Sequence, residues 1–107
     1  MDKFNRTPLH LAARNGHSNI IKLLLQHKAS INILADWKHT PLHQAARKGH
    51  TETVKVLLEN KATVNQSDDW TWTPLHYAVN NGYTEITKLL LEQVIVNIHV
   101  YIWCSLL

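Results

Sequence analysis

The sequence predicts an all-α solenoid, in which helix–turn–helix units are stacked in a row and joined by hairpin-like loops. Three observations support this fold class. The tetrapeptide Thr-Pro-Leu-His occurs three times at intervals of 33 residues, and each copy is followed in register by a glycine and then by a pair of leucines. These features stand at residues 7–10, 40–43 and 73–76, at residues 16, 49 and 82, and at residues 24–25, 57–58 and 90–91.

The length of the chain fits one domain. At 107 residues it is too short for two independent hydrophobic cores, and its 45% of hydrophobic residues is ordinary for a globular protein. We therefore expect a single domain over residues 1–107, with repeats at residues 2–34, 35–67 and 68–97 and a non-repeating apolar tail at residues 98–107.

The first helix of each unit is expected to begin at Thr-Pro. A threonine side chain accepts hydrogen bonds from the free N–H groups at a helix N-terminus, and proline suits the first helical position. In the first copy, Leu9, Ala12 and Ala13 would form the apolar face. Gly16 then suits the positive φ that ends many helices.

The second helix of each unit follows that glycine. Its candidate N-caps are Ser18, Thr51 and Thr84, and the apolar residues at positions 20, 21, 24 and 25 recur at helical spacing in the later copies. This pattern predicts that the second helix packs against the first. Polar connectors with turn-forming residues follow at positions 36–38 and 67–69.

Together these residues closely resemble the ankyrin repeat, whose signature is Thr-Pro-Leu-His-x-Ala-Ala followed by Gly-His and a Leu-Leu pair. The resemblance covers residues 2–97. Each ankyrin repeat usually has glycine at two further positions, and this chain has other residues at both positions in all three repeats. Positive φ is uncommon for other residues, so the turns are expected to be strained or differently shaped at Asn5, Lys38 and Thr71 before Thr-Pro, and at Lys28, Lys61 and Val94 after the second helix.

The resemblance implies a binding role for positions that the fold does not need. In the ankyrin family the loop tips and inner helices form a concave face that binds another protein. This chain places aromatic and basic side chains there, which contribute strongly to interfaces, together with asparagines. The candidate partner-binding residues are Phe4, Arg6, Arg14, Trp37, His39, Arg47, Lys48, Trp70, Trp72, Tyr77, Asn80 and Asn81.

Three of these residues share one register position. Phe4, Trp37 and Trp70 each stand three residues before Thr-Pro, so their rings are expected to project from successive loop tips to one side. The alternative is that the tryptophans cover neighbouring loops as packing. The function implied is binding of a partner protein, and the alternative function is a structural or scaffold fragment of a longer ankyrin array with no partner of its own.

The sequence carries no pattern typical of catalysis or metal binding. It lacks a glycine-rich phosphate loop and paired carboxylates, and Cys104 has no flanking basic residue to activate it. Equivalent histidines of stacked repeats would lie about 8–10 Å apart, too far to share an ion. The resemblance implies instead that His10, His43 and His76 hydrogen-bond the backbone of a neighbouring loop. We expect no enzyme activity, no cofactor and no metal.

The charge distribution favours protein over nucleic acid as the partner. The net charge of +3 is a gradient, from +4 over residues 1–34 through +2 over residues 35–67 to −3 over residues 68–107, whereas a nucleic-acid surface should be basic throughout. No signal peptide is recognisable, and the longest apolar run is shorter than the roughly 20 residues of a membrane span. We expect an intracellular, cytoplasmic protein that does not bind membranes.

Residues 98–107 match no repeat position. Ile98, Val100 and Ile102 alternate with other residues, which favours an extended or irregular segment that leans on the third repeat. There it would cover apolar residues that no fourth unit covers, at positions 75, 86, 89 and 90. Alternatively the tail marks a chain cut from something longer. If the tail does not pack on the third repeat, we expect it to promote self-association. The chain is otherwise expected to be monomeric.

Overall fold

The computed structural model describes residues 3–106, with side chains for residues 3–97, and this part of the chain contains six α-helices and no β-strand. The predicted all-α fold class is confirmed. The elements are α1 (Pro8–Asn15), α2 (Ser18–Gln26), the 3-10 turn η1 (Asp36–Lys38), α3 (Pro41–Lys48), α4 (Thr51–Glu59), α5 (Pro74–Asn80) and α6 (Thr84–Leu106).

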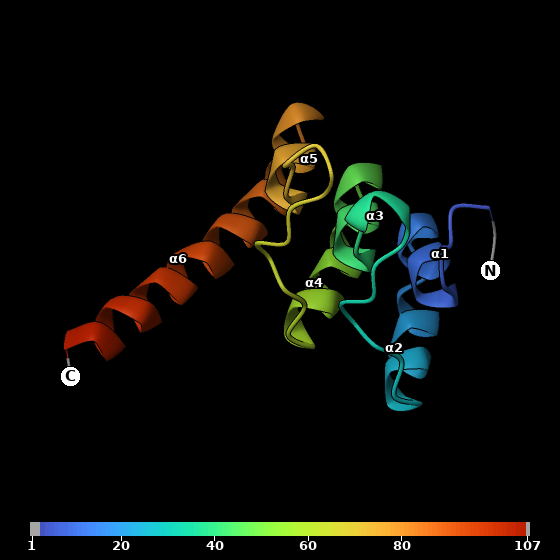
Figure 1. Cartoon of the computed structure of the whole chain (residues 1–107), viewed down its shortest axis with the longest axis horizontal. Coiled ribbons are helices and arrows are strands. Elements are labelled where there is room, and N and C mark those ends of the chain that lie inside the picture. Colours follow the sequence, from blue (N-terminus) through green and yellow to red (C-terminus); the bar gives the residue numbers. More distant parts are fainter. Residues whose placement is uncertain (1–2, 107) are drawn as a thin grey trace.

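The helices are arranged in two layers (Figure 1). In one layer α1 packs against α3, and α3 packs against α5. In the other layer α2 packs against α4, and α4 packs against α6. Each unit is thus a helix pair stacked on the next, as the 33-residue repeat predicts, and the whole molecule, with the projecting part of α6, extends 45 × 31 × 24 Å along its principal axes.

A threonine and a histidine hold the start of each first-layer helix. The hydroxyls of Thr7 and Thr40 accept hydrogen bonds from the backbone N–H of His10 and His43, at 3.4 and 3.2 Å. In return, the Nδ1 atoms of these histidines accept from the backbone N–H of the threonines, at 3.2 and 3.1 Å. Two N–H groups at each helix start are satisfied in this way.

Gly16 and Gly49 end the first-layer helices in the left-handed conformation, with φ of 75° and 80°. They also leave room for the neighbouring unit. A Cβ atom on Gly16 would lie 2.6 Å from Nδ1 of His50, and one on Gly49 would lie 2.8 Å from the ring of Tyr83. Glycine is therefore required at these positions by both the backbone and the packing.

The prediction that Ser18, Thr51 and Thr84 cap the second-layer helices is wrong. These residues are the first helical residues of α2, α4 and α6, and His17 and His50 occupy the N-cap positions of α2 and α4 without a side-chain cap bond. Other contacts use the side chains instead. Ser18 shares a hydrogen bond with the hydroxyl of Thr53 at 2.9 Å, and Nε2 of His50 donates to the carbonyl of Arg14 at 2.8 Å.

The hydrophobic core runs through the stack between the two layers. Alanines of α1, α3 and α5 are fully buried and let these helices approach closely, while leucine, isoleucine and valine of the second layer fill the other side. Ile86 and Leu90 are also fully buried, so the expectation that they lack a cover is wrong: α6 turns them towards α4. Leu75 and Leu89 are only half-buried.

Five of the six positions where the family usually has glycine adopt positive φ with a larger side chain. The values range from 57° to 68° at Asn5, Lys28, Lys38, Lys61 and Thr71, and Trp37 joins them at 61°. The turns therefore keep the shape that glycine would give. The strain expected from the sequence is present, because the left-handed conformation costs an L-residue about 1–2 kcal/mol.

The sixth position, Val94, explains why the prediction for residues 98–107 is wrong. Where α2 and α4 end and a lysine turns the chain, Val94 lies inside α6, which continues as one helix from Thr84 to Leu106. A β-branched residue tolerates positive φ poorly. Thr71 adopts it while its hydroxyl donates a hydrogen bond to the carbonyl of Trp70, whereas valine has no polar group to make such a bond, and the helix is not interrupted at Val94. Figure 1 shows the C-terminal half of α6 running away from the other helices, so it does not cover the third repeat.

The strained turns can be tested at Lys61, an exposed residue with φ of 68°. Because glycine adopts this conformation without steric cost, Lys61→Gly is expected to raise the free energy of unfolding by about 0.5–1 kcal/mol. Lys55→Gly removes an equally exposed lysine from the interior of α4 and should lower it by about 1 kcal/mol. Urea unfolding followed by circular dichroism measures both. If Lys61→Gly also lowers the free energy of unfolding, the backbone at Lys61 is not strained.

Candidate interaction face

Aromatic rings from three successive loops form a ladder along one side of the stack. The ring centroids of Phe4 and Trp37 lie 5.3 Å apart, and those of Trp37 and Trp70 lie 5.8 Å apart, with tilted planes. Trp37 is 44% exposed and Trp70 is 57% exposed. The predicted geometry is confirmed: the rings share one side of the loop tips and are not buried between helices.

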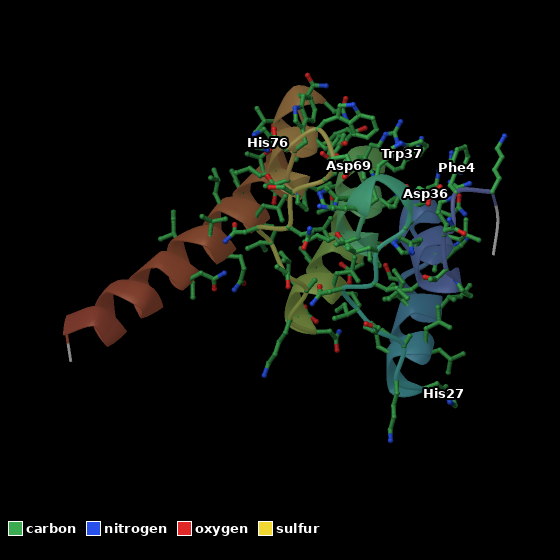
Figure 2. The ribbon with its side chains drawn as sticks, viewed as in Figure 1. Phe4, His27, Asp36, Trp37, Asp69 and His76 are labelled. Carbon is green, nitrogen blue, oxygen red and sulfur yellow. The ribbon has the colours of Figure 1, made fainter. Side chains whose placement is uncertain are left out.

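Backbone hydrogen bonds between loops hold the ladder in register. The N–H of Asp36 donates to the carbonyl of Phe4, and the N–H of Asp69 donates to the carbonyl of Trp37, both at 3.0 Å. Each aspartate thus ties its own loop to the aromatic residue of the loop before it. Figure 2 shows Phe4, Asp36, Trp37 and Asp69 along the same edge of the molecule.

Basic side chains of the first two repeats gather beside this ladder. Arg6 precedes α1, Arg14 lies in its last turn, and Arg47 and Lys48 lie in the last turn of α3. Partial burial and the nearby charges of Arg14, Arg47 and Arg6 lower the pKa of Lys48. The guanidinium of Arg6 also lies over the ring of Phe4, 5.1 Å from its centroid.

A hollow of about 280 Å³ lies between the first two rings of the ladder and the basic side chains. Five of the predicted residues with accessible side chains line it: Phe4, Arg6, Arg14, Trp37 and Arg47. Asp36 and Gln44 also line the hollow, and neither was among the predicted site residues. Gln44 adjoins the face by its register position directly after His43, which is the one sequence signal for it.

His39 was expected on the exposed face, but the structure buries it to 3% exposure. Its Nε2 atom bonds Oδ2 of Asp68 at 3.0 Å and the hydroxyl of Tyr77 at 3.1 Å, while Gln44 donates to its Nδ1 at 3.0 Å. Its side chain is held by α3, the next loop and α5 at once. His39 therefore supports the floor of the hollow and is not an exposed contact.

Asp68 is the acidic centre of this buried network, and sequence reasoning placed it only in a turn. Burial opposes its ionisation, but hydrogen bonds from the Tyr77 hydroxyl, from the backbone N–H groups of Trp72 and Trp70, and from His39 hold its pKa below the ordinary value. Burial and the Asp68 carboxylate raise the pKa of Tyr77. Asp68 is thus ionised at neutral pH and fully hydrogen-bonded.

The remaining predicted residues lie towards the other end of the stack. Trp72 is half-buried against Tyr77, 5.0 Å between centroids, and lines a separate shallow groove of about 340 Å³ with Asn80. Asn81 donates to the carbonyl of Arg47 at 3.3 Å. The structure thus divides most of the predicted residues between the basic hollow, the buried network and this terminal groove, while Trp70 belongs to the ladder and Lys48 lies beside the hollow.

Histidine bridges join the repeats beneath the face. Nε2 of His10 bonds the carbonyl of His39 at 2.8 Å, and Nε2 of His43 bonds the carbonyl of Trp72 at 3.0 Å. The structural role implied for these two histidines is confirmed. His76 makes the same contact to its own threonine, with Nδ1 2.9 Å from the N–H of Thr73, and it is exposed at the end of the stack.

The described part of the chain contains no group of three or more histidine, cysteine or acidic residues placed to hold a metal ion. None of its helices combines the length and apolarity needed to cross a membrane.

Comparison with known proteins gives two matches to family models. A model described as ankyrin repeats in three copies matches residues 1–68, and a model of the single ankyrin repeat matches residues 71–100. Together the two matches extend over all three units of the stack. No curated protein matches the chain.

The buried histidines make the stability of the stack dependent on pH. Burial lowers the pKa of His43 from 6.5 to about 4, and burial also lowers the pKa values of His10 and His39. The unfolded chain therefore binds protons first as the pH falls. The free energy of unfolding should be highest above pH 6.5 and fall towards pH 4, by about 3 kcal/mol from His43 alone.

Urea unfolding between pH 7 and pH 4 measures this loss. His43→Gln should be less stable at pH 7 but lose less stability on acidification, because glutamine does not titrate. His27→Gln is the matched control: His27 lies exposed at the far end of α2 (Figure 2), and its replacement should leave the slope unchanged. If the free energy of unfolding of His43→Gln falls with pH as steeply as that of the parent chain, His43 is not the cause of the loss.

Proposed function

The chain belongs to the ankyrin-repeat family, and from that premise we propose that it is an interaction module that binds a partner protein through its concave face. Ankyrin repeats are generally protein–protein interaction modules and typically have no enzymatic activity. The proposed contact surface consists of the aromatic ladder, Phe4, Trp37 and Trp70, and of the basic hollow beside it, lined by Arg6, Arg14 and Arg47.

The exposed ladder is the observation that carries this proposal. Folding normally buries large aromatic side chains, and their exposure in a row leaves apolar surface in contact with water. The backbone of Trp37 is held in the left-handed conformation, with φ of 61°, at a position where the family does not usually have glycine. Strain of this kind tends to cluster at sites where the surrounding structure positions a residue for binding. Both features support the proposal that this face binds a partner.

The terminal groove favours a second candidate function, a unit of a longer repeat array. It is lined by Trp72, Leu75, His76, Val79 and Asn80, and Val79 is 60% exposed. Within the stack, the equivalent histidines are covered by the loop of a following repeat. A further repeat stacked here would bury the same positions. In this case the ladder residues would have no partner of their own, which separates the two functions experimentally.

The test uses the chain as bait in a cell extract, followed by purification of the captured protein and measurement of its affinity. Trp37→Ala and Trp70→Ala are each expected to weaken binding by about 2 kcal/mol or more, roughly 30-fold, because aromatic anchors dominate interface energetics. Leu23→Ala removes a side chain that is 55% exposed on α2, outside the ladder, and should leave the affinity unchanged.

Thermal unfolding of the same variants separates binding from stability. The two tryptophan variants should melt close to the parent chain, whereas Leu57→Ala, at a fully buried position, should lose about 2–5 kcal/mol of folding free energy. Equal loss of melting temperature in all three would show that the tryptophans are structural. Capture of a nucleic acid in place of a protein, with an affinity that falls steeply as the salt concentration rises, would contradict the proposal.

A further inference from the structure

The charged side chains that line the basic hollow are mostly positive. Three arginines line it, and Lys48 lies close enough to them for its pKa to be lowered. Asp36 is the one acidic residue of the lining and accepts a hydrogen bond from Nδ2 of Asn5 at 2.8 Å. Asp68, beneath the floor, is engaged by Tyr77, His39 and two backbone N–H groups.

The arrangement of groups suits an anionic side chain. Guanidinium groups recognise carboxylates through paired hydrogen bonds, and this recognition is strongest where water is partly excluded. The hollow measures about 280 Å³, just below the range of about 300–1,000 Å³ that is usual for small-molecule pockets. This size fits one side chain of a bound segment, and the ring of Trp37 in its wall offers apolar contact to the neighbouring residue.

The surroundings of the hollow favour an acidic peptide over a nucleic acid. The net charge turns negative in the third repeat, at −3 over residues 68–107, and the last ring of the ladder, Trp70, follows Asp69 directly. A phosphate backbone running along the ladder would meet this exposed aspartate, whereas a peptide needs only one anion at the hollow. Within the hollow itself, the carboxylate of Asp36 disfavours a dianionic phosphate more than a singly charged carboxylate.

We propose that the hollow binds an aspartate or glutamate side chain of an extended segment of the partner protein, with the carboxylate held by Arg14 and Arg47 and the adjoining apolar residue packed on Trp37. This inference rests on the proposed function and adds the chemistry of the partner to it. Arg6 contributes charge from the loop before α1, and the Asp36 side chain limits how much negative charge enters.

The direct test is a nuclear magnetic resonance titration of the isotope-labelled chain with three capped peptides. The first is Gly-Leu-Glu-Leu-Gly, and the others carry glutamine or phosphoserine in place of the glutamate. The glutamate peptide should shift the signals of the Trp37 indole N–H and of the Arg14 and Arg47 side chains to saturation. The glutamine peptide should bind about tenfold more weakly, since it lacks the charge that strengthens the hydrogen bonds.

Charge-removing variants locate the site. Arg14→Gln and Arg47→Gln should each weaken binding of the glutamate peptide by about tenfold. Lys22→Gln removes the same charge from an exposed position on α2 and should bind like the parent chain. Arg47 is exposed, so its replacement is not expected to disturb folding, and unchanged backbone amide signals away from the hollow confirm this for both variants.

Several results would overturn the inference: no saturable shift with the glutamate peptide, equal binding of the glutamine peptide, tighter binding of the phosphoserine peptide, or displacement of the peptide by a single-stranded oligothymidine at equal concentration. The captured partner separates this inference from the proposed function. If Trp37→Ala loses the partner but Arg14→Gln and Arg47→Gln keep it, the acidic segment is wrong and the interaction face stands. If Trp37→Ala also keeps it, both fail.

Discussion

His10 and His43 each make hydrogen bonds in two directions from the interior of the stack. Nδ1 accepts from the threonine N–H at the start of the histidine's own helix, and Nε2 donates to the carbonyl that precedes the next Thr-Pro. One neutral imidazole ring therefore makes hydrogen bonds both to a backbone N–H at the start of its own helix and to a backbone carbonyl of the next loop. Because both partners are backbone groups, this bridge sets the distance between consecutive units, and the positions of the loops follow from it.

The loops, once aligned, bring residues that are 33 positions apart into direct contact. Phe4, Trp37 and Trp70 form a continuous ladder only because the N–H groups of Asp36 and Asp69 reach the carbonyls of the preceding loop. The alignment is strong enough to hold bulky residues in left-handed conformations. The stack thus stabilises a surface that the loop sequences would not adopt in isolation.

Negative and positive charges lie at different depths below the surface as well as in different repeats. Asp68 lies below the face, hydrogen-bonded to His39 and Tyr77, and the arginines of the first two repeats lie above it around the hollow. Gln44 links the two levels, since it lines the hollow and donates to His39. The buried network supports the floor of the hollow, and the three arginines line the hollow above it.

The sequence by itself determined the features that depend on neighbouring residues: the repeat length, the start of each first-layer helix at Thr-Pro, the glycine turns and the shared register of the aromatic rings. Only the tertiary structure decided where the side chains of different repeats meet.

His39 shares its register with Arg6 and Trp72, yet it is buried because Asp68, 29 residues later, reaches it from the next loop. The alternating pattern after Ile98 suggested an extended segment, but Val94 does not interrupt α6 and the described chain contains no strand for such a segment to pair with, so the helix continues to Leu106. Local patterns specify local conformation, whereas burial and the end of an element depend on partners that the chain brings together only when it folds.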